Sequence, residues 1–220
     1  MRIRADFSKQ AIVNRAEADW ISSPESGVDR IMLDRIGDEV ARATSIVRYA
    51  PGSKFSRHEH AIGEEFFVLA GVFSDEHGDY PAGTYVRNPP GSGHSPFSAE
   101  GCRILVKLRQ FDPADFSPVV IDTSDERLWR NDEAGQAARI DLHEFGNEKV
   151  QMLRLPKGYT YGVTVGRGGI ECLVIDGEVG FAGQVLPEES WLRLPAGADL
   201  QLFATEETTL WVKTGHLPDE

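Results

Sequence analysis

The sequence has few cysteines and no concentration of basic residues. Its 220 residues include two cysteines, Cys102 and Cys172, and no Cys-x-x-Cys pair, which excludes a zinc ribbon and a thioredoxin-like redox motif. Both lie in apolar runs, where we expect buried, reduced thiols. The formal charge is −12, from 23 Lys and Arg against 35 Asp and Glu. Nucleic-acid binding depends on neutralising phosphates, so the charge argues against a nucleic-acid partner.

Long apolar segments are also missing. No apolar run approaches the roughly 18 residues that span a membrane. The N-terminal residues Met-Arg-Ile-Arg-Ala-Asp are not followed by the apolar region of a signal peptide. We therefore predict a cytoplasmic protein with no membrane partner. Apolar residues make up 40% of the chain, enough for a substantial core.

The sequence contains an internal repeat. Five residues recur 106 positions later: Gly52, Gly71, Pro89, Gly91 and Lys107 return as Gly158, Gly177, Pro195, Gly197 and Lys213. Trp20, Leu33, Gly37 and Glu39 recur at a shift of 109, as Trp129, Leu142, Gly146 and Glu148. These matches indicate a duplicated unit. Pro and Asp cluster after a strand-like run at Asp112-Pro113, so we predict one domain over 1–112 and a second over 113–220.

Both halves carry the signals of β-strands. Short runs rich in β-branched and aromatic residues are separated by Gly, Pro, Asp or Ser. The predicted strands cover 43–49, 66–73, 84–87 and 103–108 in the first half. In the second half they cover 150–155, 161–165, 171–175, 191–194 and 208–213. Helix signals are limited to a turn or two within 6–20 and 124–129. This pattern predicts an all-β protein of two sandwiches or barrels.

Three histidines and a carboxylate form the strongest candidate site. His58 and His60 share one face of an extended strand, because side chains alternate with period two. Glu64 follows after Gly63, where the chain can turn, and His94 follows the turn Pro89-Pro90-Gly91-Ser92-Gly93. This donor set suits a divalent first-row metal. Glu65 is the rival to Glu64 for the carboxylate position.

The spacing of these residues resembles the two signature motifs of the cupin superfamily. The first motif runs from Gly52 through His58-x-His60 and Glu64 to Gly71, and the second from Gly83 through Pro89-x-Gly91 to His94. Ser98 stands where the second motif usually has Asn. The resemblance implies two tandem cupin jelly-roll barrels, a duplicated double-stranded β-helix. It also implies His58, His60, Glu64 and His94 as ligands of one metal ion.

The amino-acid sequence of residues 63–90, which connects the two motifs, resembles the cupin domain of ChrR-type anti-sigma factors. That resemblance implies a zinc-binding regulatory or sensor protein in the response to singlet oxygen and peroxides. Members of that family also carry an N-terminal helical domain with a His-x3-Cys-x2-Cys signature. The signature does not occur in these 220 residues, which argues against direct binding of a sigma factor.

The second half has lost every metal ligand. The residues that lie 106 positions after the four candidate ligands are Thr164 for His58, Gly166 for His60, Ile170 for Glu64 and Leu200 for His94. We therefore expect no metal there, and a structural role or a small apolar pocket instead. His77, His143 and His216 match no motif position and are expected to be solvated.

Two classes of function remain open. The first, which the sequence favours, is the ChrR-like sensor, with zinc as the expected ion and iron, manganese or nickel as alternatives. The second is a metal-dependent dioxygenase acting on a small diketone or a hydroxylated aromatic compound, since such dioxygenases are similar in their motifs. Arg48, Tyr85, Arg87 and Lys107 are candidates to line the mouth of the first barrel, where a cation would favour an anionic small-molecule ligand. A homodimer through an exposed strand edge is a further expectation. No catalytic residue is identified.

Overall fold

A computed structural model describes residues 1–38, 40–132 and 135–218. The described residues form strands and two short 3-10 helices, and the chain divides into two compact units. Unit 1 comprises Met1–Ala5 and Asp19–Ser124, and unit 2 comprises Asp6–Ala18 and Asp125–Glu220. The predicted ranges 1–112 and 113–220 differ from these units in two places, because 6–18 belong to unit 2 and 113–124 to unit 1. Glu39, one of the repeat positions, lies outside the described residues.

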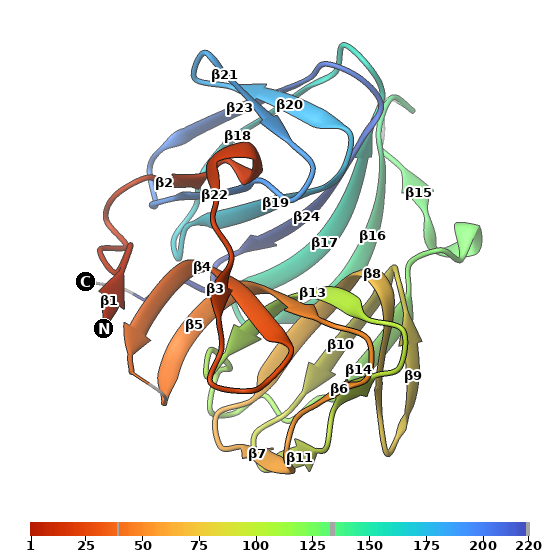
Figure 1. Ribbon diagram of the computed structural model, residues 1–220. Coiled ribbons are helices and arrows are strands. Elements are labelled where there is room, and N and C mark those ends of the chain that lie inside the picture. Colours follow the sequence, from red (N-terminus) through yellow and green to blue (C-terminus); the bar gives the residue numbers. More distant parts are fainter. Residues whose placement is uncertain (39, 133–134, 219–220) are drawn as a thin grey trace. The chain divides into compact units, whose positions relative to one another are not determined.

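Unit 1 is built on one large sheet (Figure 1). Its main path runs β1-β4-β5-β13-β8-β10-β14. These strands are β1 (Arg2–Ile3), β4 (Val28–Gly37), β5 (Ala41–Tyr49), β13 (Cys102–Leu108), β8 (Glu64–Asp75), β10 (Thr84–Asn88) and β14 (Val119–Asp122). The short strands β3 (Ile21–Ser22), β6 (Ser53–Lys54), β9 (Gly78–Pro81) and β12 (Phe97–Ser98) join this sheet off the main path. A separate two-stranded sheet pairs β7 (His58–His60) with β11 (Ser92–His94).

Unit 2 repeats this arrangement with a sheet of order β15-β16-β17-β24-β19-β22-β2. Its strands are β15 (Arg130–Asn131), β16 (Ala138–Phe145), β17 (Glu148–Leu155), β24 (Thr208–Thr214), β19 (Ile170–Asp176), β22 (Trp191–Leu194) and β2 (Ala11–Val13). A second sheet has the order β18-β23-β20-β21, formed by β18 (Thr160–Thr164), β23 (Asp199–Ala204), β20 (Glu178–Phe181) and β21 (Gln184–Pro187). The 3-10 helices are η1 (Arg15–Glu17) and η2 (Glu126–Leu128).

The strand registers confirm the internal repeat. The path β4-β5-β13-β8-β10 has the same order as β16-β17-β24-β19-β22. The irregularity between Met32 and Asp34 recurs between Asp141 and His143, at the shift of 109 found in the sequence. The predicted strands all form, with small differences at their ends. Among the described residues no sheet closes on itself, so the two tandem barrels stay a prediction within the all-β fold.

Each large sheet ends in a strand from a distant part of the chain. In unit 1, β14 pairs with β10, so that Val119 lies opposite Arg87. In unit 2, the N-terminal strand β2 pairs with β22, so that Ala11 lies opposite Arg193. Residues 6–20 therefore contribute an edge strand as well as the short helical turn η1, and the sequence signals had indicated only the turn.

In each unit, three charged residues are buried together on three corresponding strands. In unit 1, Glu65 on β8 lies opposite both Arg87 on β10 and Lys107 on β13. In unit 2, Glu171 lies opposite Arg193 and Lys213. All six side chains are almost completely buried. Buried charges are stable only when they are paired and hydrogen-bonded, so these groups fix the register of the central strands.

The Arg87 side chain has a partner on either side. It lies 2.7 Å from the Asp115 carboxylate and 3.5 Å from the Glu65 carboxylate, and its guanidinium stacks over the Phe111 ring at 4.0 Å. We expect Arg87→Met to lower the free energy of unfolding by about 3–5 kcal/mol, because it removes the cation that pairs with the buried Asp115 carboxylate and one of the two cations opposite Glu65. Urea denaturation measures the change.

The control for this variant is an exposed ion pair. Lys149 and Glu144 lie 3.0 Å apart with both side chains more than half exposed. We expect Lys149→Met to cost less than about 1 kcal/mol. Equal effects of the two substitutions would contradict a structural role for the buried group.

Candidate metal centre

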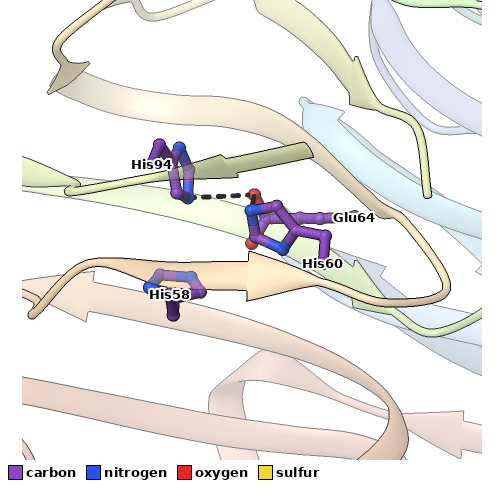
Figure 2. Close-up of side chains that lie close together, drawn as sticks. All are labelled: His58, His60, Glu64 and His94. Carbon is purple, nitrogen blue, oxygen red and sulfur yellow. Dashed lines mark ion pairs between the residues drawn. The ribbon is translucent and has the colours of Figure 1, made fainter. Parts of the chain in front are cut away.

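The four predicted metal ligands come together in unit 1 (Figure 2). Their candidate ligand atoms all lie within 4.8 Å of one another. His58 and His60 come from β7, His94 from the paired strand β11, and Glu64 from the first residue of β8. His60, Glu64 and His94 are buried, and His58 is half-buried. The described residues of the two units contain no second group of three or more His, Cys, Asp or Glu side chains placed to hold a metal ion.

Two glycines allow this convergence. Gly63 has a φ of +74° and a Cβ there would lie 2.4 Å from the Phe111 ring, so only glycine fits the turn between His60 and Glu64. Gly93 lies opposite Glu59 in the β7–β11 pair. A Cβ on Gly93 would lie 2.7 Å from the His58 carbonyl oxygen. The glycines of both motifs therefore bring the histidine strands close together.

The distances fit a shared ion. The Glu64 Oε2 atom lies 3.4 Å from His60 Nε2 and 3.3 Å from His94 Nε2. Neighbouring ligand atoms that each lie about 2.1 Å from one ion are separated by about 3.0–3.4 Å. Both Nε2 atoms are buried and form no hydrogen bond with any residue that the structure describes. A metal ion would satisfy both atoms, so the donor set fits a metal.

Hydrogen bonds on the far sides of two rings orient them. His94 Nδ1 lies 2.9 Å from Asp75 Oδ2, and His58 Nδ1 lies 3.0 Å from the Ser56 carbonyl oxygen. Asp75 is itself held by the backbone N–H of His77 at 2.8 Å. A hydrogen bond of this kind places the proton on Nδ1 and leaves Nε2 as the metal-facing lone pair.

The sequence did not reveal two residues that support the ligands. Asp75 lies eleven positions after Glu64, at the other end of β8. Asn88 donates a hydrogen bond from Nδ2 to Glu64 Oε2 at 3.1 Å. Neither residue belongs to the spaced motifs, and only the pairing of β8 with β10 brings Asn88 opposite Glu64.

The structure distinguishes Glu64 from its rival Glu65. Glu64 belongs to the metal-ligand cluster, whereas Glu65 accepts a hydrogen bond from the Tyr85 hydroxyl at 2.6 Å and lies beside Arg87. The other candidates for the mouth of the site face elsewhere. Arg48 pairs with Asp29 and stacks on Trp20, and Lys107 donates to Thr44 Oγ1.

Two of the four positions in unit 2 that correspond to the candidate ligands belong to the apolar core. Ile170 and Leu200 belong to a core cluster that also contains Val165, Cys172 and Leu202. Thr164 donates a hydrogen bond to Asp199 instead. Cys102 and Cys172 are both buried and free, as predicted. The expectation for His216 was wrong: its side chain is completely buried, 3.0 Å from the Glu171 carboxylate.

Two histidines of the cluster titrate differently. Burial lowers the pKa of His60, which favours the neutral ring that binds metal. Burial also acts to lower the pKa of His94, but the hydrogen bond with Asp75 and the charge of Glu64 outweigh it and raise that pKa. In the metal-free protein His94 therefore keeps its proton to a higher pH than an ordinary histidine.

The fold is that of cupin proteins. Among solved structures, the chain is similar to a cupin 2 conserved barrel domain protein from Leptotrichia buccalis, with 13% identity, 96% of this chain and 98% of that chain covered, and a TM-score of 0.62. More narrowly, residues 8–112 match the family model of the ChrR cupin-like domain. No curated protein matches the chain in sequence.

Two further solved structures share the fold. A provisionally assigned dioxygenase from Nostoc punctiforme has a TM-score of 0.76 at 14% identity, with 97% of this chain and 85% of that chain covered. The pirin YhhW of Escherichia coli, in complex with nickel(II), has a TM-score of 0.71 at 13% identity, with 96% of this chain and 100% of that chain covered. At these identities the likeness concerns the fold alone. No described helix has the length and apolar character needed to cross a membrane.

The link between Asp75 and His94 can be tested by substitution. We expect Asp75→Asn to weaken the affinity for Zn²⁺ or Ni²⁺ by about 10–100-fold, because the ring loses the acceptor that orients it. Competition with a chromophoric chelator measures the affinity. Asp79→Asn is the matched control, since the exposed Asp79 carboxylate accepts from Ser74 and does not touch a ligand. Identical affinities for the two variants would contradict this role of Asp75.

The raised pKa of His94 predicts a pH dependence of metal binding. A metal ion competes with the proton on His94 only below that pKa, so affinity is constant above it and falls about tenfold per pH unit below it. His60, whose pKa is lowered, adds a second proton only at a lower pH. We expect the decline to begin above about pH 6.5, the value of an ordinary histidine. An affinity that is constant from about pH 8 to 5 would contradict this assignment.

Proposed function

We propose that this protein is a metal-dependent enzyme of the cupin dioxygenase type, acting on a small organic molecule beside an ion held by His58, His60, Glu64 and His94. The observation that carries the proposal is a cavity of about 430 Å³ lined by His58, His60 and Glu64. Structural metal sites are closed, whereas catalytic sites keep a position open to a ligand. A cavity of this volume lies within the range of small-molecule sites.

The metal would supply an open coordination position at which a substrate can be polarised and, for a redox-active ion, oxygen chemistry. The protein contributes the environment. Aromatic and aliphatic side chains of the cavity, among them Tyr49, Phe55 and Phe73, limit access of water. Burial, and next to it the charge of Glu64, raises the pKa of Tyr49 well above its ordinary value, so its hydroxyl stays protonated as a hydrogen-bond donor.

A second candidate is a ChrR-like sensor that holds zinc. The match of residues 8–112 to the ChrR cupin-like domain favours it. In that case the ion would bind a small ligand or hold the shape of the site without redox chemistry, because zinc has none. The two candidates share the metal centre and differ in the ion and in turnover.

Metal content and oxygen consumption distinguish the candidates. Protein purified without added metal is analysed for its elements and tested for oxygen uptake with hydroxylated aromatic compounds and diketones. Iron or another redox metal with uptake is the expected result for the enzyme. Stoichiometric zinc without uptake would overturn the enzyme in favour of the sensor.

The ligand assignment has its own test. We expect His58→Ala to lose most of the bound metal, because it removes one of four donors. Thr164→Ala changes the corresponding position of unit 2 and is expected to retain full metal content. Full retention of metal by His58→Ala would contradict the assignment, as would loss of metal in Thr164→Ala.

A further inference from the structure

The cavity beside the candidate metal cluster is less acidic than the chain as a whole. Its charged lining consists of Arg30, Arg35, Arg109, Glu25 and Glu59 in addition to the metal ligand Glu64. The whole sequence, in contrast, has 35 acidic and 23 basic residues. These three arginines balance three carboxylates. A divalent ion held at Glu64 would add two positive charges and leave the cavity positive, which favours an anion.

Two of these arginines have no partner for their side chains within the described part of the chain. Arg35 donates to the Asp38 carbonyl oxygen. The side chains of Arg30 and Arg109, in contrast, make no hydrogen bond, ion pair or ring contact with a described residue. The Nε atom of Arg30 is buried and unsatisfied. A buried donor without an acceptor costs free energy, and a bound anion would remove that cost.

The two arginines line the cavity from different segments of the chain. Arg30 lies on β4 opposite Val47 of β5, and both residues line the cavity. Arg109 follows the last residue of β13, and its backbone N–H donates to the Gly63 carbonyl oxygen at 3.1 Å. It therefore lies next to the residue that precedes the ligand Glu64.

The backbone at Arg109 is unusual. Its φ is +60°, in the left-handed region that non-glycine residues rarely adopt. Strained residues of this kind persist where the surrounding structure demands them, often at functional sites. The conformation turns the chain at the end of β13 while Arg109 remains part of the cavity wall.

The rest of the wall is largely apolar. It includes Val28, Tyr49, Phe55, Phe73, Ile104 and Val106. A phosphate or sulfate ion would pair with the arginines and leave this surface uncovered. A molecule with a carboxylate and a hydrophobic body would satisfy both parts of the wall.

We propose that the cavity binds a small organic acid whose carboxylate pairs with Arg30 and Arg109 and whose apolar body packs on Tyr49, Phe55 and Phe73. The planar guanidinium matches a carboxylate with two parallel hydrogen bonds. The inference rests on the proposed function in one respect: a second oxygen of the acid reaches the metal. Binding of the carboxylate to the arginines requires no turnover, so it is measured without an activity assay.

Calorimetry on nickel-loaded protein tests the proposal. The probes are 2-hydroxybenzoate and 2-hydroxybenzamide, which share a ring and a phenol and differ in charge, together with inorganic phosphate. We expect the acid to bind at least about tenfold more tightly than the amide, because a hydrogen bond to a charged group contributes about 1.5–3 kcal/mol. Equal binding of acid and amide, or tighter binding of phosphate than of either, would overturn the proposal.

Substitution identifies the responsible side chain. We expect Arg30→Met to weaken binding of the acid about 10–100-fold and to leave the amide and the nickel content unchanged. Arg48→Met is the matched control: Arg48 lies on β5, is half exposed and pairs with Asp29 outside the cavity. An acid affinity in Arg30→Met equal to that of Arg48→Met would overturn the role of Arg30.

The outcomes separate this inference from the proposed function. Wild-type protein that holds no metal contradicts the metal centre itself. Wild-type protein that holds nickel and does not bind the acid contradicts only the organic-acid ligand. Should Arg109→Met, and not Arg30→Met, remove the preference for the acid, Arg30 is not the residue that binds the carboxylate.

Discussion

The alternation of side chains along one strand governs both the stability and the chemistry of unit 1. Glu64 and Glu65 are neighbours at the start of β8, and they point to opposite faces of the sheet. Glu64 joins three histidines beside a cavity, while Glu65 lies opposite Arg87 and Lys107 in a buried charged group. A shift of register by one residue would exchange the two carboxylates and destroy both groups. The ion pair between Arg87 and Asp115 resists such a shift, because it also ties β10 to the segment that leads into β14.

Unit 2 keeps the buried charged residues and lacks the candidate metal ligands. Unit 2 keeps Glu171, Arg193 and Lys213 in the same register, so the arrangement of its central strands is preserved. The position of Glu64 is taken by Ile170 and that of His94 by Leu200, both inside an apolar core. A buried carboxylate without an ion would be costly, and its replacement by a hydrocarbon side chain removes the cost. The framework is therefore the same in both units, although a cluster of histidines and a glutamate in one corresponds to a packed apolar core in the other.

The sequence predicted the strands and the four clustered residues because both depend on local spacing. The amino-acid sequence alone shows the His58-x-His60 pair, the glycines at the turns and the repeat at 106 residues. Asp75, Asn88, Arg30 and Arg109 were missed because only the pairing of distant strands brings them to the site. Arg87 and Lys107 were proposed for the mouth and lie on the opposite face. Strands β10 and β13 are buried on both faces, so their sequences lack the polar alternation that would show which face a residue occupies. Likewise, no local signal indicates that residues 11–13 pair with β22.

The position of the cluster between two sheets means that a bound metal ion would have a structural effect as well as a chemical one. The three histidines come from β7 and β11, a two-stranded sheet of three residues per strand. Two-stranded sheets of this size have little stability of their own. Glu64, in contrast, begins a strand at the centre of the large sheet. An ion bound by all four residues would therefore link the weak sheet to the strong one, and the free energy of metal binding would contribute to the order of β7 and β11. Because β7 also lines the cavity, binding of the metal would at the same time order part of the ligand site.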